Sequence, residues 1–340
     1  MALPRRALDA LTAGFCRLLL RIFFREIEVT GLARVPRGVP LVIVANHVNN
    51  LLDPMLLLAF LGAQPRFLAK HTLWRHPVVL PFLALAGAIP VYRPKEADAS
   101  RNLETFARCV ATLAGGHAVA LFPEGLSHDE ASLQPLKTGA ARMVLQAERS
   151  HPGLGVRVLP VGLVYEAKDR FRSRVRVQVG QPVDPGPDVA THVLSRPAAV
   201  RSLTGRIASG LGAVVTPYPT AEKACLQAPV ARPRWPVMVL AAAWLGAALN
   251  WLPYKIPGWA ASTLGSTPGD RATYKLFAAL FAFPLFWLLG GLLVGLWAGP
   301  RWGVAAALMA PVAARAGLHL FERRERAASA LRRKPEEPPL

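Results

Sequence analysis

Between residue 29 and about residue 183, short β-branched apolar runs alternate with stretches whose apolar residues recur at helical spacing. Parallel strands need a crossover between them, usually a helix, so this alternation favours an α/β domain with a mostly parallel central sheet flanked by helices. The expected strands are residues 40–45, 88–92, 118–122, 157–165 and 174–179, and the expected helices are residues 54–62, 99–114 and 137–150.

Residues of the types that bind ligands or catalyse reactions follow three of these strands. Asn46 and His47 follow the first strand, Arg93 follows the second, and Glu124 and Gly125 come just after the third. In an open α/β sheet, ligands bind outside the carboxyl ends of the strands. We therefore expect a functional site at this edge.

His47 is followed six positions later by an aspartate, Asp53. The carboxylate could bind one ring nitrogen and fix the tautomer, which leaves the other nitrogen free to take a proton. Asp53 and Pro54 also suit a helix N-cap followed by proline at the first helical position. The pair alone leaves both readings open.

Taken together, Asn46-His47…Asp53, Ile89–Arg93 and Phe122-Pro-Glu-Gly125 resemble the motifs of the glycerolipid acyltransferase family, which carries a His-x4-Asp motif. The resemblance covers roughly residues 28–185, and Val158–Val161 resembles the family's fourth motif, which is linked to the acyl donor. It implies that His47 and Asp53 are catalytic. It also implies acceptor-binding residues, with Arg93 on the acceptor phosphate: Asn46, Arg93, Glu124, Gly125 and Lys137.

Two departures from the family pattern stand out. Five residues, Val48 to Leu52, separate the histidine and the aspartate, where four are usual. On a continuous helix one extra residue would turn the pair apart by about 100°, but a loop before the helix would absorb it. Leu126-Ser127-His128 also replaces the frequent Thr-Arg-Ser, so one phosphate-binding arginine is missing. Candidates to replace it are Lys70, Lys137 and Arg142.

The resemblance implies direct acyl transfer from a thioester, acyl-CoA or acyl-carrier protein, to a hydroxyl of a glycerophosphate acceptor. We favour 1-acylglycerol-3-phosphate as acceptor; glycerol-3-phosphate or another lysophospholipid is the alternative. A non-catalytic membrane lipid-binding or transfer protein and a lipid hydrolase are alternatives of other classes. We expect neither a metal nor another cofactor, because His128, Asp129 and Glu130 are consecutive and cannot easily converge on one ion.

The composition is apolar and strongly basic at once. Apolar residues make up 52% of the 340 residues, and the formal net charge is +19. Disordered basic tails are poor in apolar residues, and nucleic-acid binders seldom carry apolar runs of about 20 residues. We expect anionic membrane lipids, not nucleic acid, as the partner. The three cysteines, Cys16, Cys109 and Cys225, are expected to be buried thiols in a reducing cytoplasm.

Changes in composition, together with the resemblance, predict five segments. They are an amphipathic membrane-associated helix (1–27), an acyltransferase domain (28–225), a linker (226–236), a transmembrane region (237–321) and a basic cytoplasmic tail (322–340). The apolar residues of the first segment recur every three or four positions between several arginines. Such a helix suits a membrane interface, but it could equally pack on the domain core.

Within the transmembrane region, residues 276–298 are long enough to cross a bilayer. Residues 303–321 are interrupted by Arg315, and residues 237–252 are short and expected to end at Leu252-Pro253. Because basic segments tend to stay cytoplasmic, we expect 276–321 to form a hairpin that turns at Gly299–Trp302, with 237–252 embedded without crossing. This arrangement implies an integral membrane protein with its catalytic domain facing the cytoplasm, and we expect the membrane to be a bacterial inner membrane.

Overall fold

The computed structural model describes residues 5–75, 79–92, 102–128, 130, 132–216, 244–265 and 268–331. It divides into two compact units. Unit 1 comprises Met1–Pro217 and Pro268–Ala272, and unit 2 comprises Tyr218–Thr267 and Thr273–Leu340. The predicted linker, residues 226–236, lies outside the described residues.

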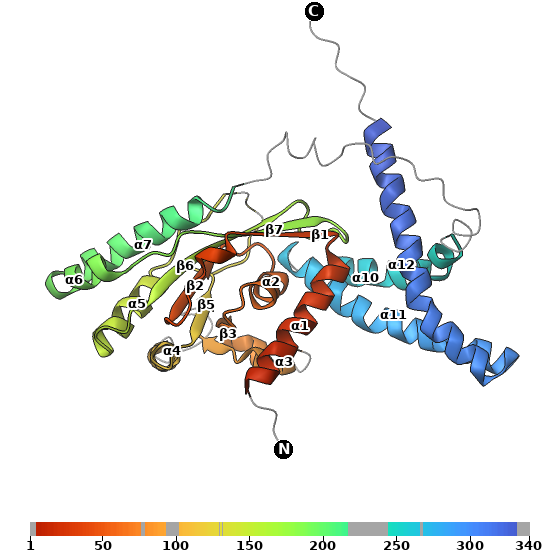
Figure 1. The fold of residues 1–340 in the computed structure, drawn as a ribbon, viewed down its shortest axis with the longest axis horizontal. Helices are drawn as coiled ribbons and strands as arrows, with labels where there is room; N and C mark the ends of the chain where they lie inside the picture. Colours follow the sequence, from red (N-terminus) through yellow and green to blue (C-terminus); the bar gives the residue numbers. More distant parts are fainter. Residues whose placement is uncertain are drawn as a thin grey trace, which may run out of the picture. The chain divides into compact units, whose positions relative to one another are not determined.

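Unit 1 is an α/β domain built on a seven-stranded sheet of order β1-β7-β6-β2-β5-β3-β4 (Figure 1). The strands are β1 (Glu26–Thr30), β2 (Leu41–Ala45), β3 (Arg66–Lys70), β4 (Ile89–Val91), β5 (Ala118–Leu121), β6 (Arg157–Tyr165) and β7 (Arg174–Val179). Every pair is parallel except β6 with β7. The predicted mostly parallel sheet and all five expected strands are present; β1 and β3 were not predicted.

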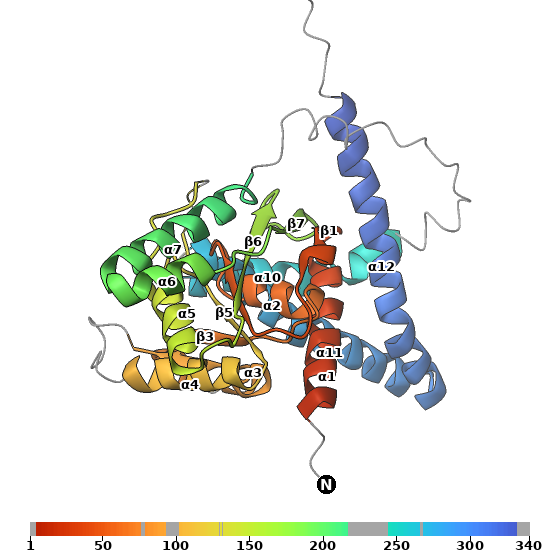
Figure 2. The ribbon, with the colours of Figure 1, turned by 60° about the vertical axis from the view of Figure 1, so that its left-hand side comes forward.

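Helices cover both faces of this sheet (Figure 2). They are α1 (Arg5–Phe23), α2 (Leu52–Phe60), α3 (Leu80–Ala86), α4 (Asn102–Ala114), α5 (Gly139–Ser150), α6 (Gly186–Leu194) and α7 (Arg196–Gly212), with short 3-10 turns η1 (Leu32–Arg34) and η2 (His71–Arg75). One face, with Val42 and Val44 of β2, packs on α4, α5 and α7. Residues alternate between faces along a strand, so Ile43 points to the opposite layer, where α1 and α2 pack together.

The N-terminal helix α1 packs on the domain core with one face, whereas its binding to a membrane stays a prediction. One face, including Cys16, Leu20 and Phe23, is buried in unit 1. An apolar stripe on the other side stays exposed: Leu11, Phe15, Leu18 and Ile22. The Arg17 guanidinium donates to the Ala59 carbonyl at 2.6 Å, which ties α1 to α2. The helix ends at Phe23, so the predicted segment 1–27 also contains the start of β1 at Glu26.

Two of the three cysteines confirm the prediction of buried thiols. Burial raises the pKa of the Cys16 thiol to about 11 and that of Cys109 to about 12. Cys225 lies outside the described residues.

In unit 2 the described elements are helical: residues 244–249, α10 (Trp251–Leu264), the body of α11 (Pro268–Ala298) and α12 (Pro300–Leu331). The predicted end at Leu252-Pro253 is wrong by a few residues. The chain instead turns at Asn250, and Pro253 lies in the first turn of α10, where a missing N–H costs no helical bond.

The predicted turn at Gly299–Trp302 is present but shorter than expected, because α11 ends at Ala298 and α12 begins at Pro300, with Gly299 between them at φ 102°. On either side of it α11 and α12 pack closely through small residues. A Cβ at Gly291 would lie 2.7 Å from the Ala307 Cβ, and one at Gly303 would lie 2.7 Å from the Gly295 Cα. Residues 269–298 are the one described helix long and apolar enough to cross a membrane, and 6% of its most apolar stretch is buried. The number of crossings stays a prediction.

Gly162 of β6 should be essential to the fold of unit 1, because the Val214 backbone lies against it. A Cβ there would approach the Val214 carbonyl carbon at 2.6 Å. Forcing a methyl group into packed backbone costs about 1–3 kcal/mol. We expect Gly162→Ala to lower the free energy of unfolding by at least that amount, measured by denaturant titration in detergent. Gly205→Ala on α7, where a Cβ meets nothing within 4 Å, is the control and should be neutral or stabilising.

Candidate active site

The predicted site residues gather where the sheet topology places them, at the carboxyl edge of the parallel strands. His47 lies in the loop between β2 and α2, Lys70 ends β3, and the turn from Phe122 to Gly125 follows β5. β7 runs antiparallel to β6, so the loop joining them, residues 166–173, also lies at this edge. Arg93, predicted to bind the acceptor phosphate, lies outside the described residues.

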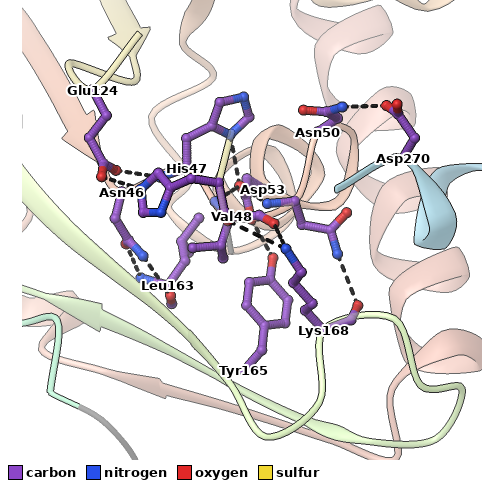
Figure 3. Close-up of polar contacts among 12 residues, drawn as sticks. Asn46, His47, Val48, Asn50, Asp53, Glu124, Leu163, Tyr165, Lys168 and Asp270 are labelled. Carbon is purple, nitrogen blue, oxygen red and sulfur yellow. Dashed lines mark hydrogen bonds and ion pairs between the residues drawn. The ribbon is translucent and has the colours of Figure 1, made fainter. Parts of the chain in front are cut away.

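His47 and Asp53 are in direct contact (Figure 3). The Nδ1 of His47 lies 2.8 Å from Oδ2 of Asp53, whose side chain has no solvent exposure. With Nδ1 occupied by the carboxylate, Nε2 is the ring nitrogen left to exchange a proton. The imidazole also stacks on Phe122, with ring centroids 4.0 Å apart and an interplanar angle of 11°. These two contacts fix the rotation of the ring.

The extra residue between His47 and Asp53 is absorbed in a loop that wraps around the carboxylate. The N–H groups of Val48 and Asn49 donate to Asp53 Oδ2 at 3.0 and 2.8 Å. Helix α2 begins at Leu52 and its N-cap is Leu51, so the reading of Asp53 as N-cap is wrong. Asp53 lies inside the first turn, and its side chain reaches back to the loop before the helix.

The end of β6 and the loop after it contribute two residues that the sequence analysis missed, Tyr165 and Lys168. The Tyr165 hydroxyl donates to Asp53 Oδ1 at 2.5 Å, and Lys168 Nζ donates to the Val48 carbonyl at 2.9 Å. Figure 3 shows both approaching the His47 loop from the β6 side. Tyr165 is the last residue of a strand parallel to β2, and that position was the available signal. Burial, reinforced by Asp53, raises the pKa of Tyr165 well above its usual value, so the hydroxyl stays a donor. Burial lowers the pKa of Lys168.

Glu124 holds the backbone of His47 in place. Its Oε1 accepts the His47 N–H at 2.8 Å, and its Oε2 accepts the Gln134 N–H at 2.9 Å and pairs with Nε2 of His128. The His128 N–H donates to the His47 carbonyl at 3.1 Å. His128, one of the residues that departs from the family motif, is therefore built into the site.

Asn46 is also held by backbone. Its side-chain oxygen accepts the Leu163 N–H at 2.7 Å, and its side-chain nitrogen donates to the Leu163 carbonyl at 2.9 Å. These bonds join the end of β2 to β6. The acceptor-binding roles of Asn46 and Glu124 stay predictions, because the contacts described here are with the protein itself.

Lys137 places an exposed positive charge beside Gly125 at the site. Gly125 has φ 76°, and a Cβ there would lie 2.7 Å from Lys137 Cε, so the lysine side chain runs directly over the glycine. The Lys137 N–H donates to the Pro123 carbonyl at 2.8 Å, which ties the start of α5 to the turn after β5. The Lys137 side chain is exposed, as is that of Arg142, one turn into α5.

The arrangement can perform general-base chemistry. A neutral imidazole on a buried carboxylate accepts a proton at Nε2, and the carboxylate stabilises the resulting imidazolium. Within the part of the chain that the structure describes, no three His, Cys, Asp or Glu side chains are grouped to hold a metal ion.

Comparison with known proteins finds one matching family model. Residues 26–164 match the model of the Acyltransferase family. The chain is 42% identical to the glycerol-3-phosphate O-acyltransferase 2 of Saccharomyces cerevisiae, over 26% of the chain and 12% of that protein. It is 29% identical to a chloroplastic 1-acyl-sn-glycerol-3-phosphate acyltransferase of Brassica napus, over 43% of the chain and 39% of that protein. The match therefore spans well under two thirds of either relative.

Among solved structures, the 1-acyl-sn-glycerophosphate acyltransferase PlsC of Thermotoga maritima matches at 20% sequence identity and a TM-score of 0.47. The alignment covers 64% of this chain and 83% of that one.

Removing the Tyr165 hydroxyl should destabilise the domain in a pH-dependent way. A hydrogen bond to a charged group contributes about 1.5–3 kcal/mol, and we expect Tyr165→Phe to lower the free energy of unfolding at neutral pH by about that much. The folded-state pKa of Tyr165 is raised, so its contribution is complete below the unfolded pKa of about 10 and is lost as pH rises towards the folded value.

The gap between wild type and Tyr165→Phe should therefore narrow above pH about 10, as measured by denaturant titration across pH. Tyr254→Phe, on the exposed side of α10, is the control. A gap that stays constant to high pH would contradict a raised tyrosine pKa.

Proposed function

Since residues 26–164 are a domain of the acyltransferase family, we propose that the protein transfers a fatty acyl group from a thioester donor to a hydroxyl of a glycerophosphate acceptor. The single observation that supports this most strongly is the His47–Asp53 contact of 2.8 Å at the carboxyl edge of the sheet. The preferred acceptor in this proposal is 1-acylglycerol-3-phosphate, and the donor is acyl-CoA or acyl-carrier protein.

The proposed reaction is a direct transfer. Nε2 of His47 takes the proton of the acceptor hydroxyl as its oxygen attacks the thioester carbonyl carbon. The carbon–sulfur bond then breaks, and the leaving thiolate takes the proton from the imidazolium. Asp53 stabilises the imidazolium in between, and its own negative charge is held by Tyr165 and the Val48 and Asn49 N–H groups. Positioning and general-base catalysis are the protein's contribution.

Glycerol-3-phosphate is a second candidate acceptor. A relative named for that substrate is 42% identical over the segment it shares with this chain. Both acceptors present a phosphate, which suits the exposed Lys137 beside Gly125 and the Arg93 predicted from sequence. The proposal also places the protein in a bacterial inner membrane, with the catalytic domain on the cytoplasmic side and residues 276–321 as the membrane hairpin expected from the sequence. The apolar part of α11 is the first arm of that hairpin.

Loss of His47 should abolish the reaction. Full-length protein in detergent is given labelled acyl-CoA or acyl-carrier protein with 1-acylglycerol-3-phosphate, glycerol-3-phosphate, a lysophospholipid without a free phosphate, or no acceptor. A general base contributes about 10²–10⁴-fold, so we expect His47→Ala to lose at least about 10²-fold in kcat. His151→Ala, an exposed histidine at the end of α5, is the matched control and should keep full activity.

The same assay separates the alternative classes. Product that depends on an acceptor supports acyl transfer, and the best acceptor gives the preference. Thioester cleavage in the absence of any acceptor indicates a hydrolase. Lipid binding without turnover of either donor indicates a binding or transfer protein, and equal activity in wild type and His47→Ala excludes His47 as the base.

Lys137 should act on acceptor binding more than on chemistry. A charge-assisted contact with phosphate contributes about 1.5–3 kcal/mol, so we expect Lys137→Ala to raise the KM for the phosphate acceptor by about tenfold or more. The KM for the thioester should change little. Arg149→Ala, an exposed cation in the last turn of α5, is the control. An unchanged acceptor KM in Lys137→Ala would show that this lysine does not bind the acceptor phosphate.

A further inference from the structure

The first turn of α11 belongs to unit 1, although the rest of this helix does not. This turn contacts the loop that carries His47. The Asn50 N–H donates to the Gly269 carbonyl at 3.3 Å, and the Asn50 side-chain nitrogen donates to Oδ1 of Asp270. Figure 3 shows Asn50 and Asp270 facing each other beside the His47–Asp53 pair. Asn50 is one of the five residues between the two members of that pair.

The same turn packs against the second departure from the family motifs. Gly269 is buried, and a Cβ on it would lie 3.2 Å from the Ser127 Oγ and 3.7 Å from the Asn50 Cγ. Ser127 occupies the place where the resembling family often has an arginine. A long side chain would need the space in which Gly269 lies. The longer His47–Asp53 loop and the small Ser127 therefore both face one turn of α11.

This turn completes the set of contacts that hold the His47 loop. Glu124 accepts the N–H of His47, and Asp53 accepts those of Val48 and Asn49. The Gly269 carbonyl of α11 accepts the N–H of Asn50. On the carbonyl side, Lys168 donates to Val48. Arg271 of the same turn lies close enough to Lys168 to oppose its protonation, which adds to the effect of burial. Successive peptides of the loop are thus held from different directions.

We propose that Asp270 is a positioning residue of the active site, which acts through Asn50 to keep His47 in its catalytic position. This inference rests on the proposed acyl transfer. A displacement of about 1 Å in a reacting group can cost about 10²-fold in rate. Loss of one tether among several should give a smaller effect, so we expect Asp270→Ala to lower kcat by about tenfold with both KM values nearly unchanged.

A plainer role for Asp270 must be separated from this one. An acidic residue in the first turn stabilises a helix by interacting with its dipole, whether or not it touches Asn50. Exchanging the two side chains distinguishes the roles. Asn50→Asp alone places two carboxylates together, whereas Asn50→Asp with Asp270→Asn restores an amide–carboxylate bond but leaves the helix start without its charge.

The test measures kcat, both KM values and the thermal unfolding midpoint of full-length protein in detergent. The variants are Asp270→Ala, Asn50→Asp and the Asn50→Asp/Asp270→Asn exchange, with Asp184→Ala as control because Asp184 is exposed and pairs with Arg157. We expect both single variants to lose kcat, the exchange to recover to within about threefold of wild type, and the control to be unaffected. Hydrogen exchange of residues 46–52 should rise in Asp270→Ala and return towards wild type in the exchange variant.

Several results would overturn the proposal. These are wild-type kcat in Asp270→Ala, an exchange variant as slow as the slower single variant, or kcat losses matched by the loss of folded protein. An inactive wild type would instead refute the proposed function. In that case hydrogen exchange still decides whether Asp270 orders the loop, and unchanged exchange in Asp270→Ala would refute the tether as well.

Discussion

A carboxylate without solvent exposure, Asp53, lies at the centre of the site. A buried charge is costly unless it is hydrogen-bonded, so its neighbours must come from wherever the chain can supply donors. They come from the β2–α2 loop, which includes His47, and from Tyr165, which is 112 residues away from Asp53 in the sequence. The carboxylate thereby ties β2, α2 and β6 together. The same bonds that make its burial tolerable orient the imidazole, so stability and proposed chemistry depend on one group.

The sheet topology explains why the donors meet there. Parallel strands β2, β5 and β6 end at one edge, and the antiparallel β7 returns the chain through a loop at that same edge. Glu124 and His128 come from the turn after β5, and Lys168 comes from the loop after β6. The second departure from the family motifs, Leu126-Ser127-His128, fits this frame. His128 pairs with Glu124, and Ser127 leaves room for Gly269.

The C-terminal helices pack in a different way from the elements of the α/β domain. α11 and α12 pack through glycine and alanine, which lets their backbones approach closely, while leucines such as Leu288 and Leu292 stay exposed. Small-residue packing with outward apolar side chains is typical of helices in lipid. On α1, by contrast, one face is buried in the domain and the apolar stripe is left on the other.

The His47–Asp53 pair was predicted only because several motifs together resembled those of one family. Local patterns in the sequence were enough for the α/β class and the five expected strands, because strand periodicity is a local signal. They could not decide whether Asp53 caps its helix or reaches back to the loop, since both use the same residues. Lys168 and Asp270 carried no signal of their own, and Tyr165 carried only its position at the end of a strand. Only the tertiary structure, by bringing segments 112 to 220 residues apart onto one loop, decided that they share a site. Such contacts depend on how strands and helices pack, which no short stretch of sequence contains.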